Sequence, residues 1–198
     1  MTRRALIALL TPVHWSPPGV PPDAWRAALV EDAVDLLATL NEIEPAIAAV
    51  QADLPLATAV AWPGMPVYPV PHPTAEPAFA AATASGYDQA AVLATDAPDV
   101  PGLVIGKLLR PLTTRLVAVA PALDGPGLLG LATQLPAPDW LPDVDLDTAT
   151  VDTIRQSAPR PGLVAVTPGW RRLRGPAQLA TLDPAVEGWD TTRALLSP

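Results

Sequence analysis

The sequence predicts an α/β fold, a single domain over residues 1–198 with a mostly parallel sheet and crossover helices. Short apolar runs bounded by Gly and Pro recur along the chain, which is typical of strands buried on both faces. Segments with helical spacing separate them, and the longest places Trp25, Leu29 and Leu36 on one side. Strands that alternate with helices imply parallel strands joined by crossover connections.

The individual elements follow from these periodicities and from Gly, Pro and Asp at their ends. Asp23 is expected to cap the first helix, Gly86 to end the second, and Asp147 or Thr148 to cap a later one. Residues 53–63, interrupted by Pro55, and the tail from residue 183 fit no single pattern. Strands are expected at residues 5–10, 46–50, 65–70, 89–95, 115–120, 127–132 and 162–167. Helices are expected at 23–40, 74–85, 102–110, 147–157 and 176–182.

The charge pattern excludes two classes of partner. The net charge is −8, and between Arg26 and Lys107 the chain holds ten acids and no Lys or Arg. Binding to a nucleic-acid backbone needs clustered cations, so DNA and RNA are not expected partners, and neither is an anionic membrane surface. No apolar run is long enough to span a bilayer. The first run, residues 5–10, lacks a signal-peptide cleavage site, so a cytoplasmic protein is expected.

Several common catalytic motifs are absent from the sequence. There is no G-x-G-x-x-G after the first strand, no G-x-x-x-x-G-K-[ST] and no G-x-S-x-G. The two histidines, His14 and His72, share no ligand spacing, and the chain has no Cys, which argues against a zinc site. The sequence therefore points away from a usual dinucleotide fold, a P-loop NTPase and a serine hydrolase.

Two acidic turns follow predicted strands. The first turn lies in residues 89–101, QAAVLATDAPDVP, where Asp96 and Asp99 come directly after an apolar run. The second lies in residues 117–131, VAVAPALDGPGLLGL, where Asp124 and Gly125 come directly after another apolar run. Ligands of open α/β sheets bind beyond the carboxyl ends of the strands, and carboxylates there suit Mg²⁺. Ordinary Asp-Pro and Asp-Gly turns remain the alternative. The metal hypothesis requires Asp96 and Asp124 to lie at the same edge of the sheet.

Together the two turns resemble the paired signature G-S-D-x-P-x-[LV] and P-x-x-D-G-G-[YF]-x-L-[LI]-G-L. It belongs to a bacterial family of glycosyltransferase-like proteins labelled radical-SAM/selenodomain-associated transferases, which are related to phospholactate guanylyltransferases. The resemblance implies a three-layer GT-A (nucleotide-diphospho-sugar transferase) fold. It further implies metal-dependent nucleotidyl or glycosyl transfer, with Mg²⁺ or Mn²⁺ as cofactor and a nucleotide or nucleotide-sugar as ligand.

Residue by residue, the resemblance assigns metal binding and catalysis to the two turns. Asp96 matches the metal-binding carboxylate of the first signature, and Asp99 matches the acid that follows it. Asp124 and Gly125 match the Asp-Gly pair of the second signature, near the acceptor or a second metal position. Such a cation neutralises substrate phosphates while the protein positions them.

The sequence departs from the family at both of its other charged segments. The family's first loop carries Lys and Arg, whereas here residues 11–25 offer only His14 as a possible cation. Near the C-terminus the family's acids are replaced by Arg171, Arg172 and Arg174, which are expected to contact phosphates or to form a solvated turn. These departures leave two other functions open. One is a catalytically degenerate relative that acts as a binding or assembly protein, and the other is a small-molecule binding protein unrelated to nucleotides.

Overall fold

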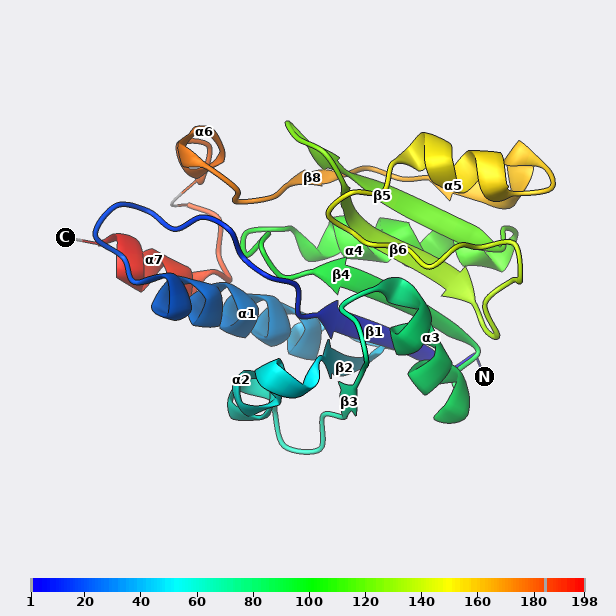
Figure 1. Cartoon of the computed structure of the whole chain (residues 1–198), viewed down its shortest axis with the longest axis horizontal. Helices are drawn as coiled ribbons and strands as arrows, with labels where there is room; N and C mark the ends of the chain where they lie inside the picture. Colours follow the sequence, from blue (N-terminus) through cyan, green and yellow to red (C-terminus); the bar gives the residue numbers. More distant parts are fainter. Residues whose placement is uncertain (1, 184, 198) are drawn as a thin grey trace.

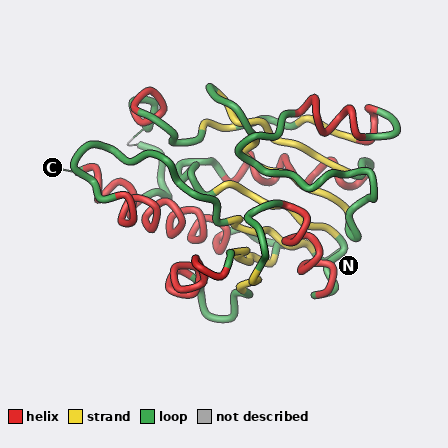
Figure 2. Tube along the Cα trace, in the orientation of Figure 1, coloured by secondary structure: helices red, strands yellow, loops and turns green. Residues whose placement is uncertain are grey.

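The computed structural model describes residues 2–183 and 185–197 and has the predicted α/β architecture (Figures 1 and 2). One sheet carries the strands in the order β3-β2-β1-β4-β6-β5-β7, and β8 pairs with β5 off this path. The strands are β1 (Arg4–Leu9), β2 (Glu44–Ala49), β3 (Val67–Pro69), β4 (Gln89–Ala94), β5 (Val117–Leu123), β6 (Leu128–Gln134), β7 (Val164–Val166) and β8 (Trp170–Arg171). The α-helices are α1 (Pro22–Thr39), α2 (Leu54–Val60), α3 (Ala75–Ala84), α4 (Gly102–Leu109), α5 (Val151–Ser157), α6 (Pro176–Leu179) and α7 (Asp190–Leu196).

Strand direction brings the ends of β1, β4 and β5 to one edge of the sheet. Strand β1 runs parallel to β2 and β4, and β5 runs parallel to β7 and β8. Strand β6 is reversed, being antiparallel to both β4 and β5. Because β4 and β5 are each antiparallel to β6, they point the same way. We call the edge where β1, β4 and β5 end the carboxyl edge.

Helices cover both faces of the sheet, which gives the three layers. Strand β4 is buried along its whole length, as its uninterrupted apolar run predicts. Side chains of α3 and α5, such as Phe79 and Ile154, pack on one face, and those of α1, α2 and α4, such as Val34 and Leu108, pack on the other. The sheet thus forms a buried middle layer from which the loops at the carboxyl edge extend.

The last part of the chain packs against the N-terminal and middle parts of α1. Leu173 is buried in a separate apolar cluster with Trp25 of α1. Asp32 of α1 accepts hydrogen bonds from the backbone N–H groups of Thr191 (3.0 Å) and Thr192 (2.7 Å) at the start of α7. This acceptor satisfies N–H groups that have no partner within the helix. The burial of Asp32 raises its pKa above the ordinary value.

Several expected element boundaries are wrong. Helix α1 starts at Pro22 with Pro21 as its N-cap, so Asp23 lies in the first turn and is not the cap. Proline suits this position because its missing N–H would have no partner in the first turn of a helix. Residues 53–63 contain α2, in whose first turn Pro55 lies, and the unassigned tail contains α7.

Helix α5 begins four residues later than expected, at Val151. Thr150 is its N-cap and accepts a hydrogen bond from the backbone N–H of Thr153, whose hydroxyl accepts one from the N–H of Thr150. This reciprocal capping box sets the start of the helix. The expected caps, Asp147 and Thr148, precede the helix, and the Asp147 side chain forms ion pairs instead.

Gly130 lets β6 pack closely against both β4 and α4. A Cβ atom there would lie 2.5 Å from Leu93 Cδ2 and 2.9 Å from the Val92 carbonyl oxygen. We expect Gly130→Ala to lower the free energy of unfolding by about 1–3 kcal/mol, as overpacking of a core does. A Cβ at Gly106, on α4, would meet no atom within 4 Å, so Gly106→Ala should stabilise the protein. Urea denaturation of both variants tests this expectation, and equal changes in the free energy of unfolding would contradict it.

Glu44, at the start of β2, provides a pH-dependent contribution to stability. It accepts hydrogen bonds from the Arg3 guanidinium (Nη2 to Oε2, 3.0 Å) and from the Tyr87 hydroxyl (2.8 Å), which lower the pKa of Glu44. A lowered folded-state pKa stabilises the protein above the unfolded pKa, and this effect is lost as the pH falls through the folded pKa. The stability difference between wild type and Glu44→Gln should therefore shrink below the ordinary Glu pKa of about 4.3. Urea denaturation across the acid range measures this stability difference, and a difference that does not change with pH would refute the pH-dependent contribution of Glu44.

Candidate functional site

Asp96 lies at the carboxyl edge, directly after β4, and its carboxylate is paired with two arginines. The residue is 6% exposed. Its Oδ1 accepts a hydrogen bond from Arg172 Nε, and its Oδ2 accepts one from Arg174 Nε at 3.2 Å. Its backbone carbonyl accepts the N–H of Leu173 at 2.7 Å. The three residues that follow β8, residues 172–174, are thus all hydrogen-bonded to the turn after β4.

Asp147 is the second carboxylate of this cluster. Its Oδ1 lies 2.7 Å from Arg172 Nη2 and 2.6 Å from Arg174 Nη2. Arg172 is 2% exposed and also donates to the carbonyl oxygens of Leu128 (3.1 Å) and Leu146 (2.9 Å). We call Asp96, Asp147, Arg172 and Arg174 the Asp–Arg cluster. Two carboxylates and two guanidinium groups balance one another, so the cluster carries no net charge.

The sequence predicts a role for Asp147 only as a possible helix cap. A local pattern nevertheless indicates that its side chain points away from the core. In residues 143–147, DVDLD, acids alternate with Val144 and Leu146, which are both buried. In an extended segment this alternation turns the acids away from the core. Asp143 accepts the N–H of Glu76 at the start of α3, whereas Asp147 turns to the arginines.

Asp99 and Arg171 form a separate ion pair beside the cluster. The Asp99 side chain is fully buried and accepts hydrogen bonds from Arg171 Nη2 and from Trp170 Nε1, the latter at 3.1 Å. The Arg171 guanidinium also lies 4.7 Å from the centre of the Trp170 ring. These contacts attach β8 to the turn after β4. Asp99 is therefore enclosed, and its carboxylate faces an arginine and a tryptophan.

Asp124 and Gly125 lie at the exposed tip of the β5–β6 hairpin, at the same edge as Asp96. Asp124 has a positive φ of 60°, which Asp tolerates in turns. Together with Arg172, Arg174 and other residues, both line a cavity of about 160 Å³. Arg174 Nη1 donates to the Pro126 carbonyl at 2.9 Å, so this arginine contacts the hairpin as well as Asp96. Among the described residues, no hydrogen bond joins the Asp124 carboxylate to the Asp–Arg cluster.

A larger cavity opens on the other side of Arg174. Its volume is about 350 Å³, within the usual range for ligand pockets. His14 and Trp15 line it from the loop after β1, Asp96 from the turn after β4, and Thr148 and Leu173 from the later segments. We call this the β1–β4 cavity. It brings together His14, Asp96 and Arg174 from the expected set of site residues, while Asp99 and Arg171 lie outside its lining.

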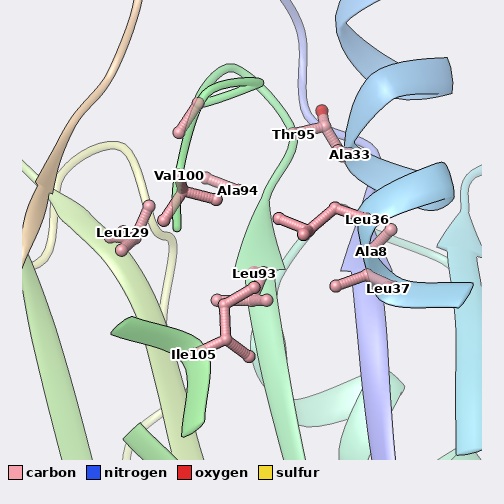
Figure 3. Close-up of a pocket in the computed structure, with 11 residues that line it drawn as sticks. Ala8, Ala33, Leu36, Leu37, Leu93, Ala94, Thr95, Val100, Ile105 and Leu129 are labelled. Atoms are coloured by element: carbon pink, nitrogen blue, oxygen red, sulfur yellow. The ribbon is translucent and has the colours of Figure 1, made fainter. Parts of the chain in front are cut away.

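An apolar cavity beneath Thr95 is too small for a ligand. It lies between α1 and β4 and is lined by side chains such as Leu36, Leu93 and Ile105 (Figure 3). Its volume of about 10 Å³ is enough for roughly one water molecule. The Thr95 hydroxyl is buried beside it without a hydrogen-bond partner among the described residues. Apart from Thr95 the lining side chains are apolar, so the cavity is a packing feature.

The residues of the Asp–Arg cluster do not fit a divalent cation as they are arranged. Mg²⁺ and Mn²⁺ need free carboxylate oxygens, but both Asp96 oxygens face N–H groups, and Asp147 Oδ1 accepts two. In residues 2–183 and 185–197, no group of three or more His, Asp or Glu side chains is placed to hold a metal. An ion bridging Asp96 and Asp147 would have to displace at least one guanidinium.

The Asp96 ion pairs should contribute strongly to stability. In Asp96→Asn, Arg172 stays buried with its charge but loses one of its two carboxylate partners. We expect the free energy of unfolding to fall by about 3 kcal/mol, the scale found when one partner of a buried ion pair is removed. The exposed Asp139 serves as control, since Asp139→Asn should change it by less than about 0.5 kcal/mol. Urea denaturation measures both, and a fully stable Asp96→Asn variant would contradict the ion-pair assignment.

No protein-family model and no curated protein matches this chain. Solved structures do match it over nearly its whole length. A Desulfovibrio desulfuricans protein assigned as a nucleotide-diphospho-sugar transferase has a TM-score of 0.66 at 19% identity, covering 99% of this chain and 97% of that one. The 4-diphosphocytidyl-2C-methyl-D-erythritol synthase of Anaerococcus prevotii has a TM-score of 0.61 at 11% identity, with coverages of 99% and 96%.

A third match was solved with a metal and a nucleotide. The glucosyl-3-phosphoglycerate synthase of Mycobacterium tuberculosis, in complex with Mn²⁺ and UDP, has a TM-score of 0.55 at 14% identity, covering 98% of this chain and 77% of that one. Identities this low show the fold alone. Among the described residues, no helix is both long and apolar enough to cross a membrane. The chain has the fold of nucleotide-diphospho-sugar transferases, which confirms the expected fold class, while the expected narrower family stays a prediction.

Proposed function

We propose that the β1–β4 cavity binds a nucleotide or nucleotide-sugar and that the protein acts as a nucleotidyl- or glycosyltransferase. The observation that carries the proposal is the position of this cavity. From β1 the chain adds β2 and β3 on one side of the sheet and β4 on the other. Ligands of open α/β sheets bind at such a reversal of strand order, beyond the carboxyl ends of the strands. The loops that line the cavity follow β1 and β4.

Arg174 is the best candidate for contact with a phosphate. Its side chain is 27% exposed, whereas that of Arg172 is 2% exposed. Its hydrogen bonds to described residues use three of the five N–H groups that a guanidinium carries, which leaves two for a ligand. His14 lines the same cavity from the β1 loop. The fold of structures solved with Mn²⁺ and UDP supports the choice of ligand.

The other expected site residues take supporting roles in this proposal. Asp96 holds Arg174 in place, and Asp124 and Gly125 lie on the hairpin side of Arg174, where an acceptor would approach. Asp99 and Arg171 fix β8 and thereby the arginines after it. Transfer would then depend on positioning and on charge neutralisation at the phosphates. A mechanism that uses Mg²⁺ or Mn²⁺ at Asp96 requires Arg172 or Arg174 to release one oxygen of this carboxylate first.

A second candidate function is a catalytically degenerate relative that binds a ligand or a partner without chemistry. The pairing of Asp96 favours it. Both Asp96 oxygens accept hydrogen bonds from arginine, so this carboxylate is not arranged as a general base or as a metal ligand. The two functions share the binding step and differ in turnover.

Binding and turnover are measured separately. Calorimetry with UDP, UDP-glucose and nucleoside triphosphates, each with Mn²⁺ or with EDTA, should detect one ligand class. Arg174→Gln should weaken its binding about 10- to 100-fold, the scale of one hydrogen bond to a charged group. Arg110 is exposed beyond the far end of α4, and Arg110→Gln should leave binding unchanged. Binding with release of the nucleotide product supports the transferase, binding without turnover supports the degenerate relative, and no binding overturns the proposal.

A further inference from the structure

From Arg171 to Arg174, the side chains point alternately to two sides. Residues 170–174 read WRRLR. Arg171 reaches Asp99, and Leu173 is buried with Trp25, whereas Arg172 and Arg174 both reach Asp96 and Asp147. In an extended chain, alternate side chains point to opposite sides. Both arginines of the Asp–Arg cluster are therefore aimed by the backbone, which is fixed by the bond between the Leu173 N–H and the Asp96 carbonyl.

The two guanidinium groups bridge the carboxylates of two distant segments. Each arginine contacts Asp96 through Nε and Asp147 through Nη2. A divalent cation shared by Asp96 and Asp147 would join the same two segments and would bring the same total positive charge. Arg172 is also anchored by the carbonyls of Leu128 and Leu146, so four of its five N–H groups are engaged.

Replacing this arrangement by a metal would be unfavourable. Displacing Arg172 would leave a buried guanidinium without its carboxylates, and a buried unpaired charge strongly destabilises a protein. Arg174 is partly exposed and already lines the cavity. The cluster therefore combines a buried cation, Arg172, with one that faces the cavity, Arg174.

We propose that Arg172 and Arg174 occupy the place of a divalent cation between Asp96 and Asp147, so that the β1–β4 cavity takes a phosphate-bearing ligand without a metal. The identity of the ligand rests on the proposed function, but the replacement of a metal ion by the two arginines does not. A protein of this kind keeps its positive charge at the site under metal-depleted conditions. It also cannot exchange one divalent ion for another.

Manganese binding by variants tests the proposal without any nucleotide. Wild type should bind no Mn²⁺ by calorimetry or by electron paramagnetic resonance, and Mn²⁺ should leave its melting temperature unchanged. The double variant Arg172→Gln/Arg174→Gln frees Asp96 and Asp147 and should gain a Mn²⁺ site. Its melting temperature should rise by about 5–10 °C when Mn²⁺ is 100-fold above the dissociation constant.

Two further variants keep the test decisive. If the double variant does not fold, Arg174→Gln, which removes the more exposed arginine, should still gain Mn²⁺ binding. Arg26→Gln is the matched control, because Arg26 forms a partly buried pair with the single carboxylate of Asp53 and should gain none. Mn²⁺ binding by wild type that is lost in Asp96→Asn would overturn the proposal. A folded arginine variant that binds no Mn²⁺ would overturn it as well.

The nucleotide experiment separates this inference from the proposed function. If wild type binds UDP or a nucleoside triphosphate, its affinity in EDTA should equal that in Mn²⁺, and a loss of binding in EDTA would overturn the metal-free site. If no nucleotide binds, the proposed function fails, while the Mn²⁺ result of the arginine variants still decides whether guanidinium groups hold the cation position.

Discussion

The pairing of Arg172 with Asp96 and Asp147 is the interaction on which the carboxyl edge of the sheet depends. A buried guanidinium is tolerated only when carboxylates and carbonyls surround it, and Arg172 has both. In meeting this requirement it joins the turn after β4, the start of β6, the segment before α5 and the strand β8. Loops that would otherwise move independently are thereby held in one arrangement around the β1–β4 cavity.

The charge balance of this edge has a functional meaning. The chain carries a net charge of −8, and its arginines at the edge are paired largely with its own carboxylates. A site so neutralised attracts an anion weakly from a distance, because no surplus of positive charge extends into solvent. Recognition of a phosphate would rely on the two remaining N–H groups of Arg174 and on the shape of the cavity.

The sequence predicts the layers of this fold better than its site. Helix α1 and strand β4 are predictable because local periodicity and continuous apolar runs determine them, and both lie close to their expected bounds. Asp96 and Asp124 follow strands whose common direction puts them at one edge. The arginine partners of Asp96 lie 76 and 78 residues away, and no local pattern encodes a pairing over that distance. The role of Asp147 escapes prediction for the same reason. Helix α7 escapes it as well, because the acceptor of its first N–H groups is Asp32, which lies far away in the sequence.

Gly127, at the base of the β5–β6 hairpin, shows how little freedom this edge has for evolutionary change. Its φ is +91°, and a Cβ there would lie 2.4 Å from the Leu146 carbonyl oxygen and 2.8 Å from that of Asp147. The Leu146 carbonyl is also an acceptor for Arg172. A side chain at residue 127 would therefore push away the backbone that carries the second carboxylate. A single methyl group at this position would therefore disturb the ion pairs of Asp147, and substituting the arginines would not relieve the clash, because the atoms that it meets belong to the backbone.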